Sequence, residues 1–334
     1  MNSKINFNHK TILITGGAGF IGSNLAHYFQ KSFPQSHIVI FDCFRNDNRF
    51  ANGNLKSFGH FNNLINFKGD VICGNINSKT DLDRLNKYNF DFIFHYAAIS
   101  DTRIYDQEII MRTNVNSFYD IIKLASNHNA ILIYASSAAT YGDLPSPQTI
   151  GKENPQNPYG FSKLMMDQIA LKYSEESNNI VIIGLRFFNV YGPGEFYKDS
   201  TSSMIIQLGH QILNKVKPRL FENSENIFRD FIFIEDVIEA NILATHSKKS
   251  GIYNVGTGKP RSFKDIVDIL QETLKTSLEI EYFPNPYKDY QHHTQANINS
   301  FKKDLGFNPK ISLEEGINIY TNEIKLTASY KKNG

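Results

Sequence analysis

The sequence lacks several features that would assign it to other classes of protein. Its 334 residues include two cysteines, no tryptophan and a formal net charge of only +2. Cys43 and Cys73 fall in no metal-ligand or redox spacing, which favours a reduced, cytosolic protein. The balanced charge gives no indication of nucleic acid or an anionic membrane as a partner. The N-terminus MNSKINFNHK has no apolar core of a signal peptide, and no apolar run reaches membrane-spanning length. We therefore expect a cytoplasmic protein.

Short β-branched runs alternate with helical stretches through the first half of the chain. Strands are expected at residues 11–15, 37–42, 90–98, 130–137 and 180–188. Helices are expected near residues 20–31, 78–87, 104–128 and 160–177. The near-continuous hydrophobicity of the strand runs is typical of parallel strands buried on both faces. This order predicts an α/β fold with a doubly wound parallel sheet, the Rossmann-type dinucleotide-binding fold.

The alternation of strands and helices loosens after about residue 188. We expect a further strand returning to the sheet at 228–237, a strand and turn at 253–258, and helices near 262–274 and 313–326. The Asn-rich residues 43–66 are expected to form a loop excursion. The chain is thus divided into a dinucleotide-binding domain, residues 1–188 with a returning segment near 226–250, and a smaller interleaved α/β substrate lobe, mainly residues 189–334.

The stretch TGGAGFIG, residues 15–22, lies between the first expected strand and the first expected helix. Gly16, Gly19 and Gly22 would let backbone N–H groups, with those of Phe20 and Ile21, approach a pyrophosphate at the positive end of the helix. Such a glycine triplet also occurs in simple tight turns. The strand before it and the helix after it favour dinucleotide binding.

Asp42 ends the second expected strand, about twenty residues past the glycine motif, where a carboxylate accepts hydrogen bonds from the adenosine ribose. That position favours NAD. Arg45 and Arg49 follow in the same loop, however, and a guanidinium there could hold the 2′-phosphate of NADP. Solvated loop charges are the simpler interpretation of both arginines, so the residues leave NADP and NAD open.

The stretch HYAAIS, residues 95–100, ends the third expected strand with small side chains. Small residues let the ribose and phosphate of a cofactor lie against the backbone, which makes Tyr96, Ala97, Ala98, Ile99 and Ser100 candidate cofactor contacts. Asn114, in the helix that follows, either braces this backbone as a buried amide or lies on the helix surface.

The strongest evidence for a catalytic site comes from two stretches taken together, YASSAATYG and NPYGFSK. Tyr159 and Lys163 are four residues apart in an expected helix, so both side chains lie on one face. A tyrosine has a pKa of about 10, and a nearby lysine ammonium together with a positive nicotinamide ring would lower it toward that of a base. Ser137, at the end of the fourth expected strand, could donate to the same substrate oxygen.

We expect no metal site. His292 and His293 have no third ligand at metal spacing and are more often surface residues. The pairs Glu235–Asp236 and Glu175–Glu176 are typical of solvated helix ends.

Taken together, these motifs resemble those of the extended short-chain dehydrogenase/reductases that modify nucleotide sugars, over almost the whole chain. Within that branch, FFNVYGPGEFYKDS, RLFENSENIFRDFIFIEDV and YQHHTQA resemble the ADP-L-glycero-D-manno-heptose 6-epimerase family of lipopolysaccharide core synthesis. The resemblance implies oxidation at C6″ of an ADP-heptose to an aldehyde, reorientation of that group, and re-reduction on its other face. It implies that Lys198 is a second acid/base opposite Tyr159.

The resemblance also implies binding residues, a tightly bound NADP and a homo-oligomer, commonly a pentamer. Further cofactor contacts would be Cys43, Asn75, Ile76 and Val190. Substrate contacts would be Ser137, Asn189, Ser200, Gln207, Phe221, Glu222, Asn223, Ser224, Arg229 and Tyr290, with Arg229 on the diphosphate. The chain departs from the family pattern in having Gln207 for a histidine, Cys43 for an asparagine, Asn75 for an acid, and a longer loop at 43–66.

Three alternatives are weighed against this resemblance. A UDP- or GDP-hexose 4-epimerase would turn a 4-keto sugar over within the site, and one tyrosine would serve both faces. A 4,6-dehydratase is less favoured because SSAATYG lacks the acidic pair after the serine. A non-catalytic, cofactor-sensing protein on the same fold would tend to lose the tyrosine–lysine pair, which is present here.

Overall fold

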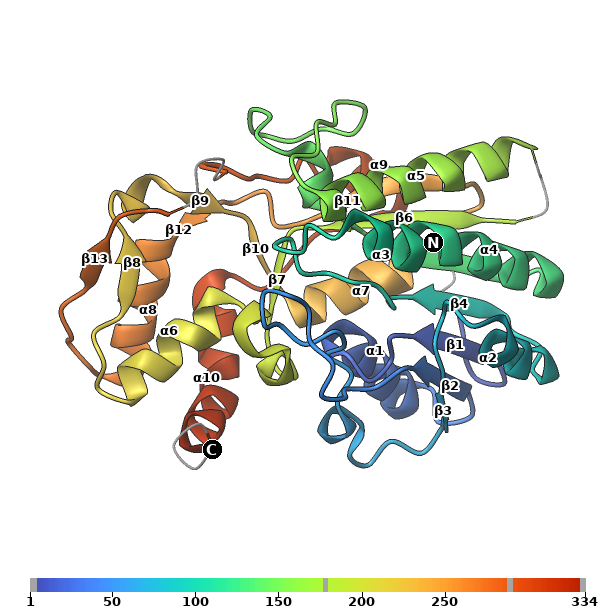
Figure 1. Ribbon diagram of the computed structural model, residues 1–334, viewed down its shortest axis with the longest axis horizontal. Helices are drawn as coiled ribbons and strands as arrows, with labels where there is room; N and C mark the ends of the chain where they lie inside the picture. The colour runs from blue at the N-terminus through green and yellow to red at the C-terminus, as the bar shows by residue number, and fades with distance from the viewer. Residues whose placement is uncertain (1–4, 177–179, 287–290, 331–334) are drawn as a thin grey trace.

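A seven-stranded parallel sheet forms the centre of the molecule (Figure 1). The computed structural model describes residues 5–176, 180–286 and 291–330. The strand order is β11-β6-β5-β4-β1-β2-β3, and every neighbouring pair is parallel. The strands are β1 (Thr11–Thr15), β2 (His37–Asp42), β3 (Asp70–Cys73), β4 (Phe92–His95), β5 (Ile131–Ser137), β6 (Ile182–Phe187) and β11 (Gly251–Val255).

Helices cover both faces of this sheet. Successive strand residues point to opposite sides, so each strand presents apolar side chains to both faces. On β1, Ile12 and Ile14 join one buried cluster with α1 and α7, while Leu13 joins a second cluster with α4 and α5. The helices of these layers are α1 (Phe20–Ser32), α7 (Ile234–Ala244), α2 (Lys79–Asp83), α3 (Gln107–Ile110), α4 (Ser117–His128) and α5 (Pro158–Glu176). A π-helical segment, η3 (Met111–Asn116), joins α3 to α4.

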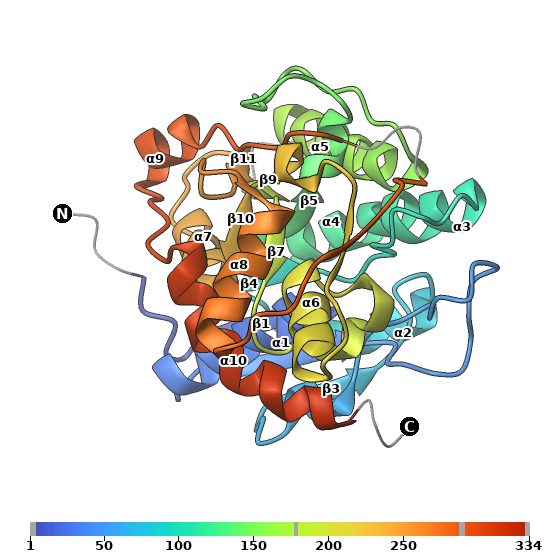
Figure 2. The ribbon, with the colours of Figure 1, turned by 90° about the vertical axis from the view of Figure 1, so that its left-hand side faces the viewer.

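The second half of the chain adds a smaller lobe beside the carboxyl ends of the strands. Three helices pack side by side in it (Figure 2): α6 (Met204–Leu213), α8 (Phe263–Leu274) and α10 (Leu313–Tyr330). Three two-stranded sheets pair β7 (Asn189–Tyr191) with β10 (Phe231–Phe233), β9 (Phe228–Arg229) with β12 (Arg261–Ser262), and β8 (Arg219–Phe221) with β13 (Glu281–Phe283). The remaining helices are α9 (Asn299–Leu305), η1 (Phe61–Leu64), η2 (Arg84–Lys87), η4 (Ala138–Tyr141), η5 (Phe196–Thr201) and η6 (Ser224–Asn226).

The predicted doubly wound α/β fold is confirmed, and the first two strands have the expected bounds. The prediction for residues 228–237 was wrong: β10 pairs with β7 outside the main sheet, and α7 begins at Ile234. The strand that returns to the sheet is β11, beside β6. β3 was not predicted, because it is a short edge strand in which only Ile72 is buried. Within the described residues, no helix has the length and apolar character needed to cross a bilayer.

Candidate active site

A cavity of about 920 Å³ lies at the carboxyl ends of the central strands and continues into the second lobe. Residues that follow β1, β4, β5 and β6 form one side, and residues from η5, α6 and β9 form the other. This is the place where doubly wound parallel sheets bind their ligands, because the connecting loops open there.

The glycine loop after β1 approaches the neighbouring backbone so closely that side chains are excluded. Gly16 has a φ of +68°, and a Cβ on it would lie 2.6 Å from the backbone nitrogen of Ala97. A Cβ on Gly22 would lie 2.5 Å from the Gly16 carbonyl oxygen. No side chain caps α1, and no acidic residue lies in its first turn. The loop and the helix end therefore fit a dinucleotide pyrophosphate.

Asp42 closes one end of the cavity. Its buried carboxylate accepts hydrogen bonds from the backbone N–H groups of Ala18 (3.0 Å) and Phe44 (2.8 Å). Burial raises the pKa of Asp42, and these two hydrogen bonds oppose the rise. Residues 56–59 of the excursion lie against it, since a Cβ on Gly59 would be 2.2 Å from Asp42 Oδ1. Cys43, Asn75 and Ile76 line this end of the cavity as well.

The two arginines after Asp42 bind backbone carbonyls. The Arg45 guanidinium donates to the carbonyl oxygen of Tyr197. Arg49 donates to the Gly53 carbonyl at 2.8 Å, on the exposed part of the excursion. Among the described residues, neither Arg45 nor Arg49 lines the cavity. Lys56, which no sequence motif indicated, does line it.

Asn114 is fully buried and braces the backbone after β4. Its Oδ1 accepts from Ile99 N at 2.8 Å, and its Nδ2 donates to the Ile99 carbonyl and to Ser162 Oγ, each at 2.9 Å. It does not line the cavity itself. The segment that Asn114 supports, residues 96–100, does line the cavity.

Tyr159 and Lys163 lie one helical turn apart at the start of α5, beside Ser137 at the end of β5. Lys163 Nζ donates to the Ala135 carbonyl at 2.7 Å and lies 5.9 Å from the centroid of the Tyr159 ring. Burial lowers the pKa of Lys163 to about 8, and the charge of Asp167 opposes that shift. Burial raises the pKa of Tyr159, and its hydrogen bond with Ser137 acts against the rise.

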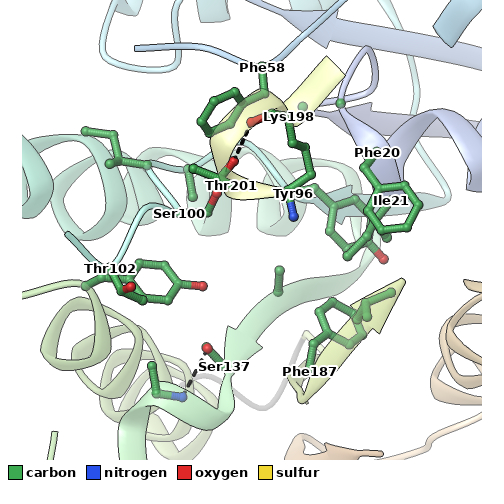
Figure 3. A pocket seen from close by; sticks show the side chains of 18 of the residues that line it. Phe20, Ile21, Phe58, Tyr96, Ser100, Thr102, Ser137, Phe187, Lys198 and Thr201 are labelled. Atoms are coloured by element: carbon green, nitrogen blue, oxygen red, sulfur yellow. Dashed lines mark hydrogen bonds between the residues drawn. The ribbon is translucent and has the colours of Figure 1, made fainter. Parts of the chain in front are cut away.

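Lys198 enters the same cavity from η5, on the side opposite Ser137 (Figure 3). Its Nζ lies 5.6 Å from the centroid of the Phe20 ring at the start of α1. Burial lowers the pKa of this half-buried lysine, and the charge of Glu195 opposes that shift. Two groups able to exchange protons, Tyr159 and Lys198, therefore line one cavity from different elements.

The candidate substrate residues divide into two groups. Ser137, Asn189, Arg229 and the candidate cofactor contact Val190 line the cavity. The others are described but lie outside its lining: Ser200, Gln207, Phe221, Glu222, Asn223 and Ser224. Ser200 Oγ donates to Asn54 Oδ1 at 2.9 Å, and Gln207 Nε2 donates to the Ser202 carbonyl at 2.7 Å. Tyr290 lies outside the described residues.

The sequence motifs also missed an aromatic part of the lining. Phe187, Phe188, Phe231 and Phe263 line the cavity between the two lobes. The first two end a strand run that was assigned to the core, and Phe231 belongs to β10, whose pairing was predicted wrongly. Phe263 begins α8, a helix predicted near residues 262–274 without any place at the cavity. An apolar wall of this kind suits the flat rings and the sugar carbon face of a bound nucleotide sugar.

Known proteins resemble the chain over nearly its full length. The model of the NAD dependent epimerase/dehydratase family matches residues 12–256. An ADP-L-glycero-D-manno-heptose-6-epimerase of Brachyspira hyodysenteriae is 33% identical over 326 residues, 96% of this chain and 99% of that relative. The crystal structure of a Helicobacter pylori ADP-L-glycero-D-manno-heptose-6-epimerase has a TM-score of 0.89 at 46% identity, covering 97% of this chain and 98% of that chain.

A more distant structure has another substrate. The UDP-N-acetylglucosamine 4-epimerase of Methanobrevibacter ruminantium, in complex with UDP-N-acetylmuramic acid, has a TM-score of 0.83 at 25% identity, covering 94% of this chain and 97% of that chain. The family match includes the glycine loop, the Tyr159–Lys163 pair, the Lys198 loop and all of β11. The chain belongs to the NAD dependent epimerase/dehydratase family.

Proposed function

We propose that the protein interconverts ADP-D-glycero-β-D-manno-heptose and ADP-L-glycero-β-D-manno-heptose at C6″, and so supplies heptose for the lipopolysaccharide core in the cytoplasm. The observation that carries this proposal is that Tyr159 and Lys198 line one cavity, with Lys198 on the side opposite Ser137. The likeness to heptose epimerases at 33% and 46% identity supports the choice of sugar.

The chemistry at C6″ explains the use of two proton-transfer groups. C6″ is bonded to both C5″ and C7″, so its oxidation gives a ketone and not the aldehyde expected from the family resemblance. Hydride leaves carbon while the hydroxyl proton passes to one base. The ketone then turns about the C5″–C6″ bond, hydride returns to its other face, and the oxygen accepts a proton on the other side. Tyr159 would serve one side and Lys198 the other.

The residues at the carboxyl ends of the strands suit a nicotinamide dinucleotide. The amide groups after Gly19 would hold the pyrophosphate, Asp42 the adenosine ribose, and Lys163 the nicotinamide ribose. When bound, this cofactor would supply the hydride acceptor and a positive charge beside Tyr159. The chain's own contribution is to hold Tyr159 half-buried, to bond it to Ser137 and to set the Lys163 ammonium near its ring.

We propose NADP as the retained cofactor, with Lys56 as the cation for its 2′-phosphate, since Lys56 lines the same end of the cavity as Asp42. Lys56→Met should weaken NADP retention by about tenfold and leave NAD unchanged, as a lost charge–phosphate contact would. Lys68→Met, at an exposed position, is the control.

We also propose that the protein is a homo-oligomer. Light scattering of the holoprotein would give its molar mass and so the number of subunits.

The proposed reaction can be tested with purified protein and no added cofactor. Incubation with ADP-D-glycero-β-D-manno-heptose should yield the L-glycero epimer by NMR, and Tyr159→Phe should slow this by about 10²–10⁴. Conversion of UDP-glucose to UDP-galactose, with the heptose left untouched even after NADP or NAD is added, would overturn the proposal in favour of a hexose 4-epimerase.

A further inference from the structure

Glu195 is a buried carboxylate that the proposed reaction does not use. It is fully buried and lies at the start of η5, three residues before Lys198. The backbone N–H of Lys198 donates to the Glu195 carbonyl at 2.9 Å, so the two residues share one helical turn. A buried, ionisable side chain is rare unless its charge is compensated.

The Glu195 carboxylate closes the loop that carries the lysine. Its Oε1 accepts from Ser203 Oγ at 2.7 Å and from Gly192 N at 3.3 Å, and its Oε2 accepts from Ser203 N at 2.6 Å. Gly192 precedes η5 and Ser203 follows it. The carboxylate therefore ties both ends of this loop together with three hydrogen bonds from uncharged donors.

Among the described residues, Lys198 is the cation whose charge acts on Glu195. Burial raises the pKa of Glu195, and the charge of Lys198 lowers it. The other groups facing the carboxylate are Tyr191, Tyr320 and Glu323. The pKa of each is raised, by burial first and in part by the negative charge of Glu195. On the lysine side, the Phe20 ring is uncharged, so Glu195 supplies the compensating charge.

We propose that Glu195 is the positioning residue for Lys198: it closes the lysine's loop and supplies a negative charge that acts on its ammonium. This inference rests on the proposed function for its effect on turnover. Glu195 touches neither the substrate nor the cofactor position, because it does not line the cavity. It acts on the reaction only through the place and the charge of Lys198.

The test is Glu195→Gln, which keeps the shape and one acceptor oxygen but removes the charge. The Lys198 ammonium would then lose the negative charge that raises its pKa, and the lysine should titrate about one pH unit lower, the effect of one nearby opposite charge. Where Lys198 acts as the acid, activity falls above its pKa; where it acts as the base, activity rises above it. Lys198 is the acid in one direction of the reaction and the base in the other. The limb of the pH–rate profile that Lys198 sets should therefore move to lower pH in both directions.

Glu323→Gln is the matched control. Glu323 accepts from Gly194 N at 2.8 Å in the same loop, and its loss also converts a carboxylate to an amide. Glu195, and not Glu323, is the carboxylate that shifts the pKa of Lys198. We expect no movement of the limb in this variant. Equal movement in both variants, or none in Glu195→Gln, would overturn the proposal.

A second readout does not depend on turnover. The rate at which Lys198 is acetylated by acetic anhydride, followed against pH by peptide mass spectrometry, reports its titration directly. We expect the midpoint to be lower in Glu195→Gln than in the wild type. If the wild type does not act on ADP-heptose but this midpoint shifts, the proposed function fails and the role of Glu195 stands. Glu195→Asp, which keeps the charge, should keep the wild-type midpoint, and it serves if the glutamine variant does not fold.

Discussion

The imidazole ring of His60 stacks on the phenol ring of Tyr197, with centroids 3.8 Å and planes 6° apart. His60 belongs to the excursion at residues 43–66, and Tyr197 directly precedes Lys198. Asn62 Nδ2 also donates to the Tyr197 hydroxyl at 2.7 Å, and Arg45 donates to its carbonyl. The excursion that covers Asp42 is thereby joined to the loop that places Lys198.

Removing this junction should loosen the Lys198 loop and the cover over Asp42 together. Tyr197→Ala loses the ring stack, worth about 1 kcal/mol, and should lower kcat by about tenfold while the cofactor is released faster. The measurements are kcat and the cofactor content after repeated desalting. Tyr119→Ala, at an exposed position on α4, is the control. A variant with wild-type turnover and retention would show that the junction has no such role.

Asp167 lies one turn after Lys163 and anchors a buried ionic network. Its carboxylate accepts from Tyr134 OH (2.7 Å), Ser136 Oγ (2.9 Å) and Arg186 Nε (2.8 Å). Asp167→Asn leaves the Arg186 guanidinium without this buried charge, so it should cost about 3–5 kcal/mol in the free energy of unfolding.

Urea titration measures this loss, and an exposed pair is the control. Asp268→Asn breaks the Lys264–Asp268 contact, in which both side chains are about half exposed, and should cost less than about 1 kcal/mol. Equal losses in the two variants would contradict the assignment of the Asp167 network as the stabilising one.

His95 should make the stability of the protein fall as the solution is acidified. It is buried, with Nδ1 2.8 Å from Thr15 Oγ1, and burial and the charge of Lys163 lower its pKa to about 3 from the ordinary 6.5. Between these values the unfolded chain binds a proton that the native protein does not. Stability is therefore complete above pH 6.5 and falls below it, by about 1.4 kcal/mol per pH unit.

Replacing His95 removes this source of pH dependence. The free energy of unfolding of the wild type should fall by about 2 kcal/mol more than that of His95→Asn between pH 6.5 and 5. The comparison is of slopes, so a uniformly less stable variant still tests it. Parallel curves for the two proteins would show that His95 titrates normally in the native state.

Local sequence patterns could predict the sheet and the motifs that end its strands. β1 and β2 have the predicted bounds because their apolar runs are continuous and their ends carry glycine or a carboxylate. Gly16, Tyr159 and Lys163 were found because glycine spacing and one helical turn are local signals. Resemblance to a family was needed for Lys198, since a loop lysine is usually solvated.

The contacts around Lys198 could not be predicted from local patterns. His60 and Tyr197 are 137 positions apart, and the stack between them leaves no periodicity in either segment. No local pattern marks Glu195 as buried, because Tyr320 and Glu323 beside it belong to α10 at the far end of the chain. β9 and β10 were merged into one expected strand, since FRDFIF is apolar on both sides of the break at Asp230.

The backbone of Asp199, next to Lys198, is strained, with φ +53° and ψ −124°. Such a conformation costs a residue with a side chain about 1–3 kcal/mol, and glycine adopts it readily. Asp199→Gly should therefore stabilise the protein by about 1 kcal/mol and lower kcat by freeing the lysine's loop. Asn129→Gly is the control, because Asn129 lies at φ 51° and ψ 32° in the ordinary left-handed region and should gain little. Thermal unfolding of the wild type and of the two variants measures these changes in stability. A less stable Asp199→Gly would show that the aspartate side chain is needed there.

The most direct test of the two-sided site is single-turnover oxidation of each epimer by Tyr159→Phe and by Lys198→Met, followed by the absorbance of reduced cofactor. Both variants should hold cofactor as the wild type does. If Tyr159 and Lys198 serve opposite sides, each variant should lose the oxidation of one epimer by about 10²–10⁴ and keep much of the other, with the pattern reversed between the two variants. Loss of both epimers in Tyr159→Phe, with neither lost in Lys198→Met, would show that one tyrosine serves both faces.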